Sequence, residues 1–329
     1  MYHITEWGDD MRVVEYIDTK KALGGPATLG FASDAGSDAA ERLMKQLWLE
    51  VYTFEKRFSR FLQTSELSIF NQRAGARVAI SAEFEKLLRA ARQQAQATQG
   101  LYDPFILPAL QKAGYKGTAD ATYAGDATAD YSKRTVADIS QLEIEEGYGR
   151  IPYSSAIDLG GCGKGYLADQ LGLILREAGV AGYWLELSGD IAMFGEDADG
   201  RPVTVAVQSA AGDTLSEPIT CPSSPSGVAT SGTFRRSTQS ETLTGHHIID
   251  PRTGRPAETD VLLATVQADT AIDADVLASC AVIVGSERAA DYLRHHGARA
   301  WIIQYQNEDG AYELMTEGIN TAIEMGAHA

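Results

Sequence analysis

A glycine-rich segment directly before a helical pattern is the part of the sequence best suited to chemistry. Residues 158–165 read D-L-G-G-C-G-K-G. Glycines let a ligand approach the backbone, a helix N-terminus offers N–H groups and a positive dipole end, and Lys164 adds a charge, so the segment suits a phosphate or pyrophosphate. It is not a Walker A loop, because Gly165 stands where Ser or Thr would bind magnesium, and it is not a G-x-G-x-x-G motif. A glycine-rich turn needed only for tight packing is the alternative.

Asp275 and Ser279 are candidate metal ligands. They lie four residues apart in a predicted helix and therefore share one face. A carboxylate and a hydroxyl are both oxygen ligands, which favours Mg²⁺ over zinc. Asp273, two residues before Asp275, is expected to point elsewhere. The alternative is an exposed Asp beside a small Ser, which is an ordinary surface arrangement.

Two adjacent histidines precede a predicted turn. His246 and His247 are followed by residues 248–254, I-I-D-P-R-T-G, in which Pro presets φ and Gly permits a positive φ. A histidine at the edge of such a turn can act as a general base. A solvent-exposed histidine pair is the alternative.

Two small-residue turns are further candidates for an anion site. Residues 187–191 (L-S-G-D-I) end a predicted strand, and residues 230–236 (T-S-G-T-F-R-R) end in two arginines. Arg235 and Arg236 stand out in an acidic chain, but neighbouring side chains on a strand point to opposite faces. Ordinary turns are the alternative for both segments.

Apolar spacing predicts the elements that position these residues. Helices are expected over 37–58 with Ser37 as cap, over 81–100 with Gly100 as stop, directly after 160–165, and over 271–283. Strands are expected over 183–187, 264–268 and 300–305. Residues 117–132 and 209–227 are rich in turn-forming residues and are expected to be surface insertions. Because helices and strands mix without regular βαβ alternation, the pattern favours an α+β fold.

Composition limits the ligand classes and the compartment. The 329 residues include 28 Lys plus Arg and 45 Asp plus Glu, and the net charge of −17 repels nucleic acid and anionic membranes. The three cysteines, Cys162, Cys221 and Cys280, lie far apart, so we expect a reducing compartment and neither a disulfide framework nor a zinc site. No apolar window approaches the roughly 18 residues of a membrane span. No signal peptide or lipobox is recognised, so a cytoplasmic location is expected unless a leader has been removed.

In their order along the chain, these patterns resemble the FAD:protein FMN transferase family, also called the ApbE family. The resemblance extends from about residue 22 to residue 285. Seven blocks carry it: 58–71 (F-S-R-F, then S-E-L-S and N), 102–115 (Y-D-P, L-P and G-Y), 158–165, 187–191, 231–236, 247–254 (H-I-I-D-P-R-T-G) and 270–279 (T-A-I-D-A-D-V-L-A-S). Seven blocks in the right order are more specific than any one of them.

The resemblance implies a fold and a reaction. It implies an α+β, ApbE-like fold in which two related halves of the tunnelling-fold (T-fold) type pack as one continuous unit, a single catalytic domain over residues 1–329 with the FAD site between its halves. Members cleave FAD with Mg²⁺, attach FMN through a phosphoester to a Thr or Ser hydroxyl of an acceptor protein, and release AMP. The acceptor carries a motif of the D-G-x-[ST]-G-[AS]-T type.

The resemblance also implies roles for individual residues. Mg²⁺ would be held by Asp275, Ser279 and the carbonyl of Gly161. His247 would deprotonate the acceptor hydroxyl. FAD would be contacted by the remaining site residues, with Phe61 near the flavin end and Ile249 lining the pocket: Phe61, Leu101, Tyr102, Asp103, Asp158, Lys164 and Ile249.

Departures from the family pattern leave the type of reaction open. Ser279 replaces the usual Thr, which keeps the hydroxyl. Phe61 stands where transferring members often have Tyr, which puts the balance between transfer and hydrolysis in doubt. The alternatives are therefore an FAD pyrophosphatase that gives FMN and AMP, and a flavin-binding protein without turnover.

Overall fold

The computed structural model describes residues 12–115, 136–215, 217–233 and 246–319. The predicted insertion over 117–132 lies outside the described residues, and so do Arg235 and Arg236. Within the described ranges, no helix is both long and apolar enough to cross a membrane.

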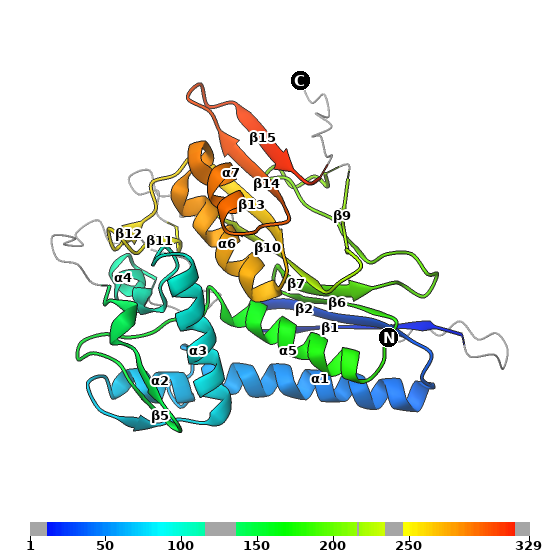
Figure 1. The fold of residues 1–329 in the computed structure, drawn as a ribbon, viewed down its shortest axis with the longest axis horizontal. Coiled ribbons are helices and arrows are strands. Elements are labelled where there is room, and N and C mark those ends of the chain that lie inside the picture. The colour runs from blue at the N-terminus through cyan, green and yellow to red at the C-terminus, as the bar shows by residue number, and fades with distance from the viewer. Residues whose placement is uncertain (1–11, 116–135, 216, 234–245, 320–329) are drawn as a thin grey trace.

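One antiparallel sheet of eight strands runs through the molecule (Figure 1). Its spatial order is β1-β2-β6-β7-β10-β13-β14-β15, and every neighbouring pair is antiparallel. The strands are β1 (Val14–Ala22), β2 (Gly25–Ser33), β6 (Gly182–Leu187), β7 (Asp190–Gly195), β10 (Ser226–Gly232), β13 (Val261–Ala268), β14 (Ala300–Gln306) and β15 (Tyr312–Glu317). The three predicted strands correspond to β6, β13 and β14. The mixture of this sheet with separate helices confirms the α+β prediction.

The two halves of the sheet repeat one order of elements. In the first half, two strands are followed by the helices α1 (Ser37–Phe58) and α5 (Gly163–Glu177) and then by two more strands. In the second half, β10 and β13 are followed by α6 (Ala271–Val284) and α7 (Ser286–His295) and then by β14 and β15. The halves join where β10 pairs with β7, with Val228 opposite Ile191.

A lobe of short elements is inserted between α1 and α5 and lies at the left of Figure 1. Its elements are α2 (Glu66–Gln72), β3 (Val78–Ala79), α3 (Ala82–Ala97), η1 (Pro104–Ile106), α4 (Leu107–Lys112), η2 (Ile139–Gln141), β4 (Glu143–Glu145) and β5 (Tyr148–Arg150). Phe84, Leu87 and Leu88 of α3 are fully buried in the core that this lobe shares with α6. The lobe therefore packs against the second half of the fold although it is inserted in the first.

The observed ends of two helices differ from the predicted ends. Ser37 is not a cap: Gly36 occupies the N-cap of α1 without a side-chain hydrogen bond, and Ser37 is the first helical residue. Helix α3 ends at Ala97 rather than at Gly100, whose φ is +81° and whose N–H donates to the carbonyl of Ala95 at 2.8 Å. Gly100 therefore closes the turn after the helix, a role that glycine fills at little conformational cost.

The segment from 209 to 227 differs in part from the expected surface insertion. Leu215, Ile219 and Cys221 are buried against the face of the sheet opposite the helices, and Ser226 begins β10. The two-stranded pair β8 (Thr204–Val205) and β9 (Ile219–Thr220) lies in the same region. The buried residues are single apolar side chains between turn-forming residues, so the composition of the segment did not predict that it is buried.

Helix α6 is apolar on nearly all sides and lies inside the protein. It packs against β10, β13, α5 and α7, as expected for a helix without a polar face. The carboxylate of Asp169, on α5, accepts the N–H groups of Ala271 at 2.8 Å and of Ile272 at 3.0 Å. This pair of hydrogen bonds ties the start of α6 to α5.

Asp169 gives the protein a pH-dependent stability. Burial raises the pKa of Asp169 to about 6, from an ordinary value of 3.8. The folded state therefore holds this proton to higher pH than the unfolded state, and the free energy of unfolding falls as pH rises from about 4 to about 6. We expect urea unfolding to show the wild type losing roughly 2–3 kcal/mol relative to Asp169→Asn over that range. A constant difference between the two proteins would contradict this assignment.

Candidate functional site

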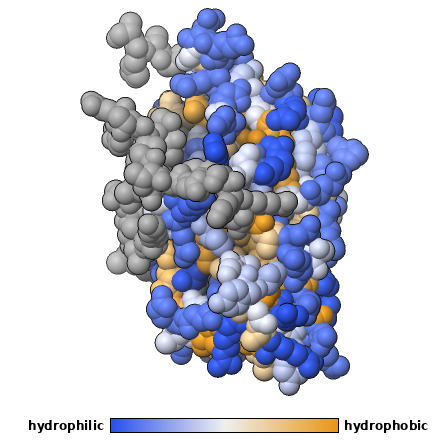
Figure 2. All heavy atoms as spheres, turned by 90° about the vertical axis from the view of Figure 1, so that its left-hand side faces the viewer, coloured by the Kyte–Doolittle hydropathy of each residue, from blue (hydrophilic) through white to orange (hydrophobic). Residues whose placement is uncertain are grey.

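A cavity of about 1320 Å³ opens where the inserted lobe meets the strand ends of the sheet. Its walls include every residue that the family resemblance places at the site: Phe61, Leu101, Tyr102, Asp103, Asp158, Gly161, Lys164, His247, Ile249, Asp275 and Ser279. Figure 2 shows the side of the molecule with this lobe, where apolar side chains lie between hydrophilic ones. The fold therefore brings together residues that are far apart in the chain.

The glycine-rich segment both packs and lines the cavity. A Cβ on Gly165 would lie 2.4 Å from the carbonyl oxygen of Ala271, so only glycine allows α5 to approach α6 this closely. Gly161 has a different environment, because its nearest neighbour would be the ring of Tyr102 at 3.5 Å, and it lines the cavity. The packing alternative therefore holds for Gly165 but does not account for Gly161.

Lys164 reaches from the first turn of α5 to carboxylates on two other elements. Its ammonium forms an ion pair with Asp190, the first residue of β7, and lies 4.0 Å from the carboxylate of Asp275. The cation therefore stands at the point where α5, α6 and the sheet meet.

Asp275 and Ser279 project into the cavity from α6, one helical turn apart. Asp275 is only 3% exposed, so the alternative of an ordinary surface Asp is excluded. Burial, and then the nearby charge of Asp190, raise the pKa of Asp275 to about 7. The N–H of Gly165 is 3.4 Å from its carboxylate. The hydroxyl of Ser279 hydrogen bonds with that of Ser231 on β10 at 2.8 Å.

The oxygen donors among the residues that line the cavity suit Mg²⁺. A buried carboxylate with distant partners, a hydroxyl and a backbone carbonyl of Gly161 are hard oxygen donors, which magnesium prefers. Over the ranges that the structure describes, no three His, Cys, Asp or Glu residues form a group able to hold a metal. Magnesium binding would therefore depend on the hydroxyl, the carbonyl and oxygen atoms of a substrate, in addition to Asp275.

Asp273 points away from the cavity, as predicted. Its carboxylate accepts the side-chain amide of Gln94 at 2.6 Å and the hydroxyl of Thr270. Thr270 in turn caps α6 by accepting the N–H of Asp273 at 3.2 Å. Asp273 thus serves the start of the helix.

The two histidines lie in different environments. His246 is buried, its Nε2 lies 2.9 Å from the carbonyl of Ala257, and its Nδ1 accepts the N–H of Ile248 at 3.3 Å. Because a carbonyl only accepts, Nε2 carries the proton and the ring is neutral; burial also lowers the pKa of His246. His247 lines the cavity, with its ring centroid 6.2 Å from that of Tyr115. The alternative of a solvent-exposed pair is therefore wrong for His246, which is structural.

The turn that follows the histidines is confirmed. Ile249 and Asp250 form β11 (Ile249–Asp250), which pairs with β12 (Arg255–Pro256). The side chain of Arg252 donates from Nε and Nη2 to the carboxylate of Asp250, and the N–H of Gly254 donates to the Asp250 carbonyl at 2.8 Å. This turn holds Ile249 and His247 against the cavity.

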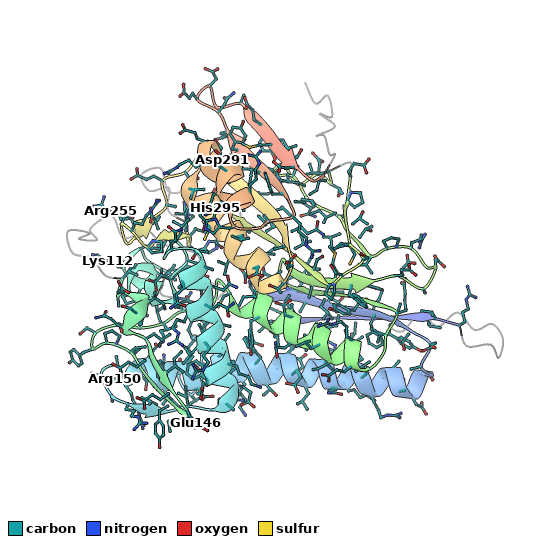
Figure 3. The ribbon with its side chains drawn as sticks, in the orientation of Figure 1. Lys112, Glu146, Arg150, Arg255, Asp291 and His295 are labelled. Carbon is teal, nitrogen blue, oxygen red and sulfur yellow. The ribbon has the colours of Figure 1, made fainter. Side chains whose placement is uncertain are left out.

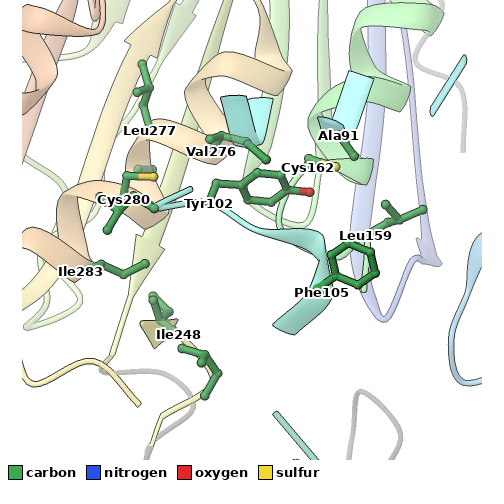
Figure 4. Close-up of a cluster of buried hydrophobic side chains, with 14 of the residues drawn as sticks. Ala91, Tyr102, Phe105, Leu159, Cys162, Ile248, Val276, Leu277, Cys280 and Ile283 are labelled. Atoms are coloured by element: carbon green, nitrogen blue, oxygen red, sulfur yellow. The ribbon is translucent and has the colours of Figure 1, made fainter. Parts of the chain in front are cut away.

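Tyr102 and Cys162 form a buried pair at the base of the site. Figure 4 shows the tyrosine hydroxyl beside the sulfur. Burial raises the pKa of Tyr102 well above its usual range and that of Cys162 to about 12. Both groups are therefore neutral, and the Cys162 thiol is not a nucleophile near pH 7.

Asp103 and Asp158 stabilise the loops that carry them. Asp103 caps η1 by accepting the N–H of Phe105 at 2.8 Å. Asp158 accepts the N–H of Gly160 at 2.5 Å and forms an ion pair with Arg60 at 3.2 Å. Each carboxylate thus fixes backbone at the cavity wall.

Arg60 and Tyr115 line the cavity although the sequence predicted no role for either. Asp190 and Ser231 also line it, and for them the sequence predicted only that their segments, 187–191 and 230–236, could line an anion site. Asp190 lies within the L-S-G-D-I block and Arg60 within F-S-R-F, so their neighbourhoods carried a signal. Their partners lie about 26 to 98 residues away in sequence, and only the fold reveals them.

Comparison with known proteins identifies similar sequences and a similar fold. The model of the ApbE family matches residues 23–302. A relative from Salmonella typhimurium named FAD:protein FMN transferase is 30% identical over 152 residues, which are 46% of this chain and 43% of the relative. A Vibrio cholerae protein with the same name is 28% identical over 75% of this chain and 73% of its own.

Two solved structures share the fold. The apo flavinyl transferase ApbE of Pseudomonas stutzeri superposes with a TM-score of 0.79 at 20% identity, covering 94% of this chain and 96% of that chain. The ApbE protein of Thermotoga maritima gives a TM-score of 0.79 at 24% identity, over 91% and 96% of the two chains. At these identities the likeness concerns the fold alone.

Proposed function

The chain belongs to the ApbE family, and we propose that it is a Mg²⁺-dependent FAD:protein FMN transferase. In this reaction the pyrophosphate of FAD is cleaved, the FMN phosphate forms an ester with a Thr or Ser hydroxyl of an acceptor protein, and AMP leaves. The acceptor carries a D-G-x-[ST]-G-[AS]-T-type motif. The proposal includes an acceptor in the cytoplasm.

One observation carries the proposal: eleven residues drawn from five separate parts of the chain line the same cavity. They supply a cation, a helix N-terminus, oxygen donors and an imidazole. Phosphoryl transfer depends mostly on positioning and on charge stabilisation, and these are the groups it needs.

Each group of residues at the cavity has a separate role in the proposed reaction. Lys164 and the N-terminus of α5 meet the negative pyrophosphate. Asp275, Ser279 and the carbonyl of Gly161 would hold magnesium, which would neutralise further phosphate charge when bound. His247 removes the proton from the acceptor hydroxyl, because imidazole is the side chain whose ordinary pKa lies nearest neutral pH.

An FAD pyrophosphatase is the second candidate, and Phe61 favours it. This ring is 38% exposed at the cavity, where a phenol would add a hydrogen-bonding group. In that reaction water replaces the acceptor hydroxyl, and the products are FMN and AMP.

An assay of two products tests the proposed function. The protein is incubated with FAD and Mg²⁺, with and without an acceptor domain that carries the motif, while AMP release and acceptor mass are followed. An FMN-sized mass gain on the acceptor is the expected result. AMP and free FMN without acceptor modification would favour the pyrophosphatase, and FAD bound but uncleaved would indicate a flavin-binding protein.

His247→Ala is expected to lower the transfer rate by about 10²–10⁴-fold while FAD still binds, because only the base is removed. Transfer is measured by acceptor mass and FAD binding by flavin fluorescence. His295→Ala is the control, since His295 is exposed on α7 and lies away from the cavity lining (Figure 3). Wild-type transfer by His247→Ala would exclude the assignment of the base.

Asp275→Ala is expected to abolish the dependence of activity on Mg²⁺ and to remove Mg²⁺ binding measured by calorimetry. Asp273→Asn is the control, because Asp273 lies on the same helix and faces Gln94 instead of the cavity. Unchanged activity in Asp275→Ala, or full wild-type activity in a chelator, would rule out the metal site.

A further inference from the structure

Arg60 connects three walls of the cavity. It follows α1 by two residues, and its side chain is only 12% exposed. One guanidinium nitrogen, Nη1, lies 3.2 Å from Oδ2 of Asp158 in the glycine-rich segment. The guanidinium carbon lies 4.6 Å from the ring centre of Phe61 and 4.7 Å from that of Tyr115.

The contact with Tyr115 extends toward His247. The rings of Tyr115 and His247 are 6.2 Å apart and inclined by 32°. Arg60 thus meets Phe61 at one wall, Asp158 at the second, and Tyr115, the neighbour of His247, at the third.

Charge makes this cation necessary in the cavity. The chain has a net charge of −17, and the cavity is lined by several carboxylates, among them Asp158, Asp190 and Asp275. An anionic dinucleotide would be repelled unless these charges were balanced. Lys164 pairs with Asp190, and Arg60 pairs with Asp158, whose side chain is 7% exposed. Removing one partner of such a buried pair leaves an uncompensated charge.

We propose that Arg60 is a positioning residue for the transfer reaction. Its guanidinium balances the charge of the Asp158 carboxylate and holds it in place, and its planar face orients the rings of Phe61 and Tyr115. A guanidinium can pair with a carboxylate and stack on rings at once, whereas an ammonium cannot match this geometry. The part that concerns the orientation of Tyr115 next to His247 rests on the proposed function. The part that concerns Asp158 predicts an effect on FAD binding, which can be measured without any acceptor.

The first test compares Arg60→Met with Arg57→Met. Arg57 makes the same kinds of contact, ion pairs with Glu66 at 2.9 Å and Glu83 at 3.2 Å and a ring contact with Phe58, but it does not line the cavity. We expect Arg60→Met to raise the Kd for FAD about tenfold by flavin fluorescence titration, and Arg57→Met to lower Tm with an unchanged Kd. If Arg60→Met lowered Tm but bound FAD like the wild type, Arg60 would be merely structural and the inference would fail.

The second test uses Arg60→Lys, which keeps the charge and therefore also serves if the Met variant does not fold. Its Kd for FAD is expected within about threefold of the wild-type value, while kcat for acceptor modification at saturating FAD falls about tenfold because the planar stack is lost. Wild-type Kd and kcat together in Arg60→Lys would overturn the positioning role. If the wild type binds FAD but modifies no acceptor, the proposed function fails, while the Kd comparison still decides the role of Arg60 in binding.

Discussion

The close contact between α5 and α6 is the constraint on which the site depends. Gly165 allows the two helices to meet at the backbone of Ala271, and Asp169 fastens them one turn further along. This contact sets the 4.0 Å separation between Lys164 and Asp275, one from each helix. A larger residue at 165 would push the helices apart and separate the cation from the carboxylate, whatever the rest of the cavity did.

Around this contact, charge is arranged in pairs. An acidic protein that handles an anionic substrate must balance its own carboxylates before it can attract the phosphates. Lys164 with Asp190, and Arg60 with Asp158, do this at two points of the wall. Asp275 lies 4.0 Å from the ammonium of Lys164, and its pKa is raised by burial and by the nearby charge of Asp190. A bound divalent ion would stabilise its charged form.

Local spacing predicted those parts of the structure that depend on local geometry. The i, i+4 relation of Asp275 and Ser279 placed both on one face, and the turn after His247 follows from its own Pro and Gly. The cap of α1 was not predictable in this way, because Gly36 caps the helix without a side chain. The packing of residues 209–227 was not predictable either, because Leu215 packs with strand residues far away in sequence, such as Met193 and Ile302. His246 and His247 are neighbours in sequence, yet only the fold distinguishes a structural ring from one that faces the cavity.

The repeated order of elements has a thermodynamic consequence. Lys164 belongs to the second helix of the first half, and Asp275 to the first helix of the second half, so the cavity is lined from both sides of the β7–β10 seam. Neither half alone contains both residues. A ligand that touches both helices binds only when both repeats are folded and joined, so its binding energy stabilises the seam itself. Ligand binding in the cavity and the association of the two halves are therefore thermodynamically coupled.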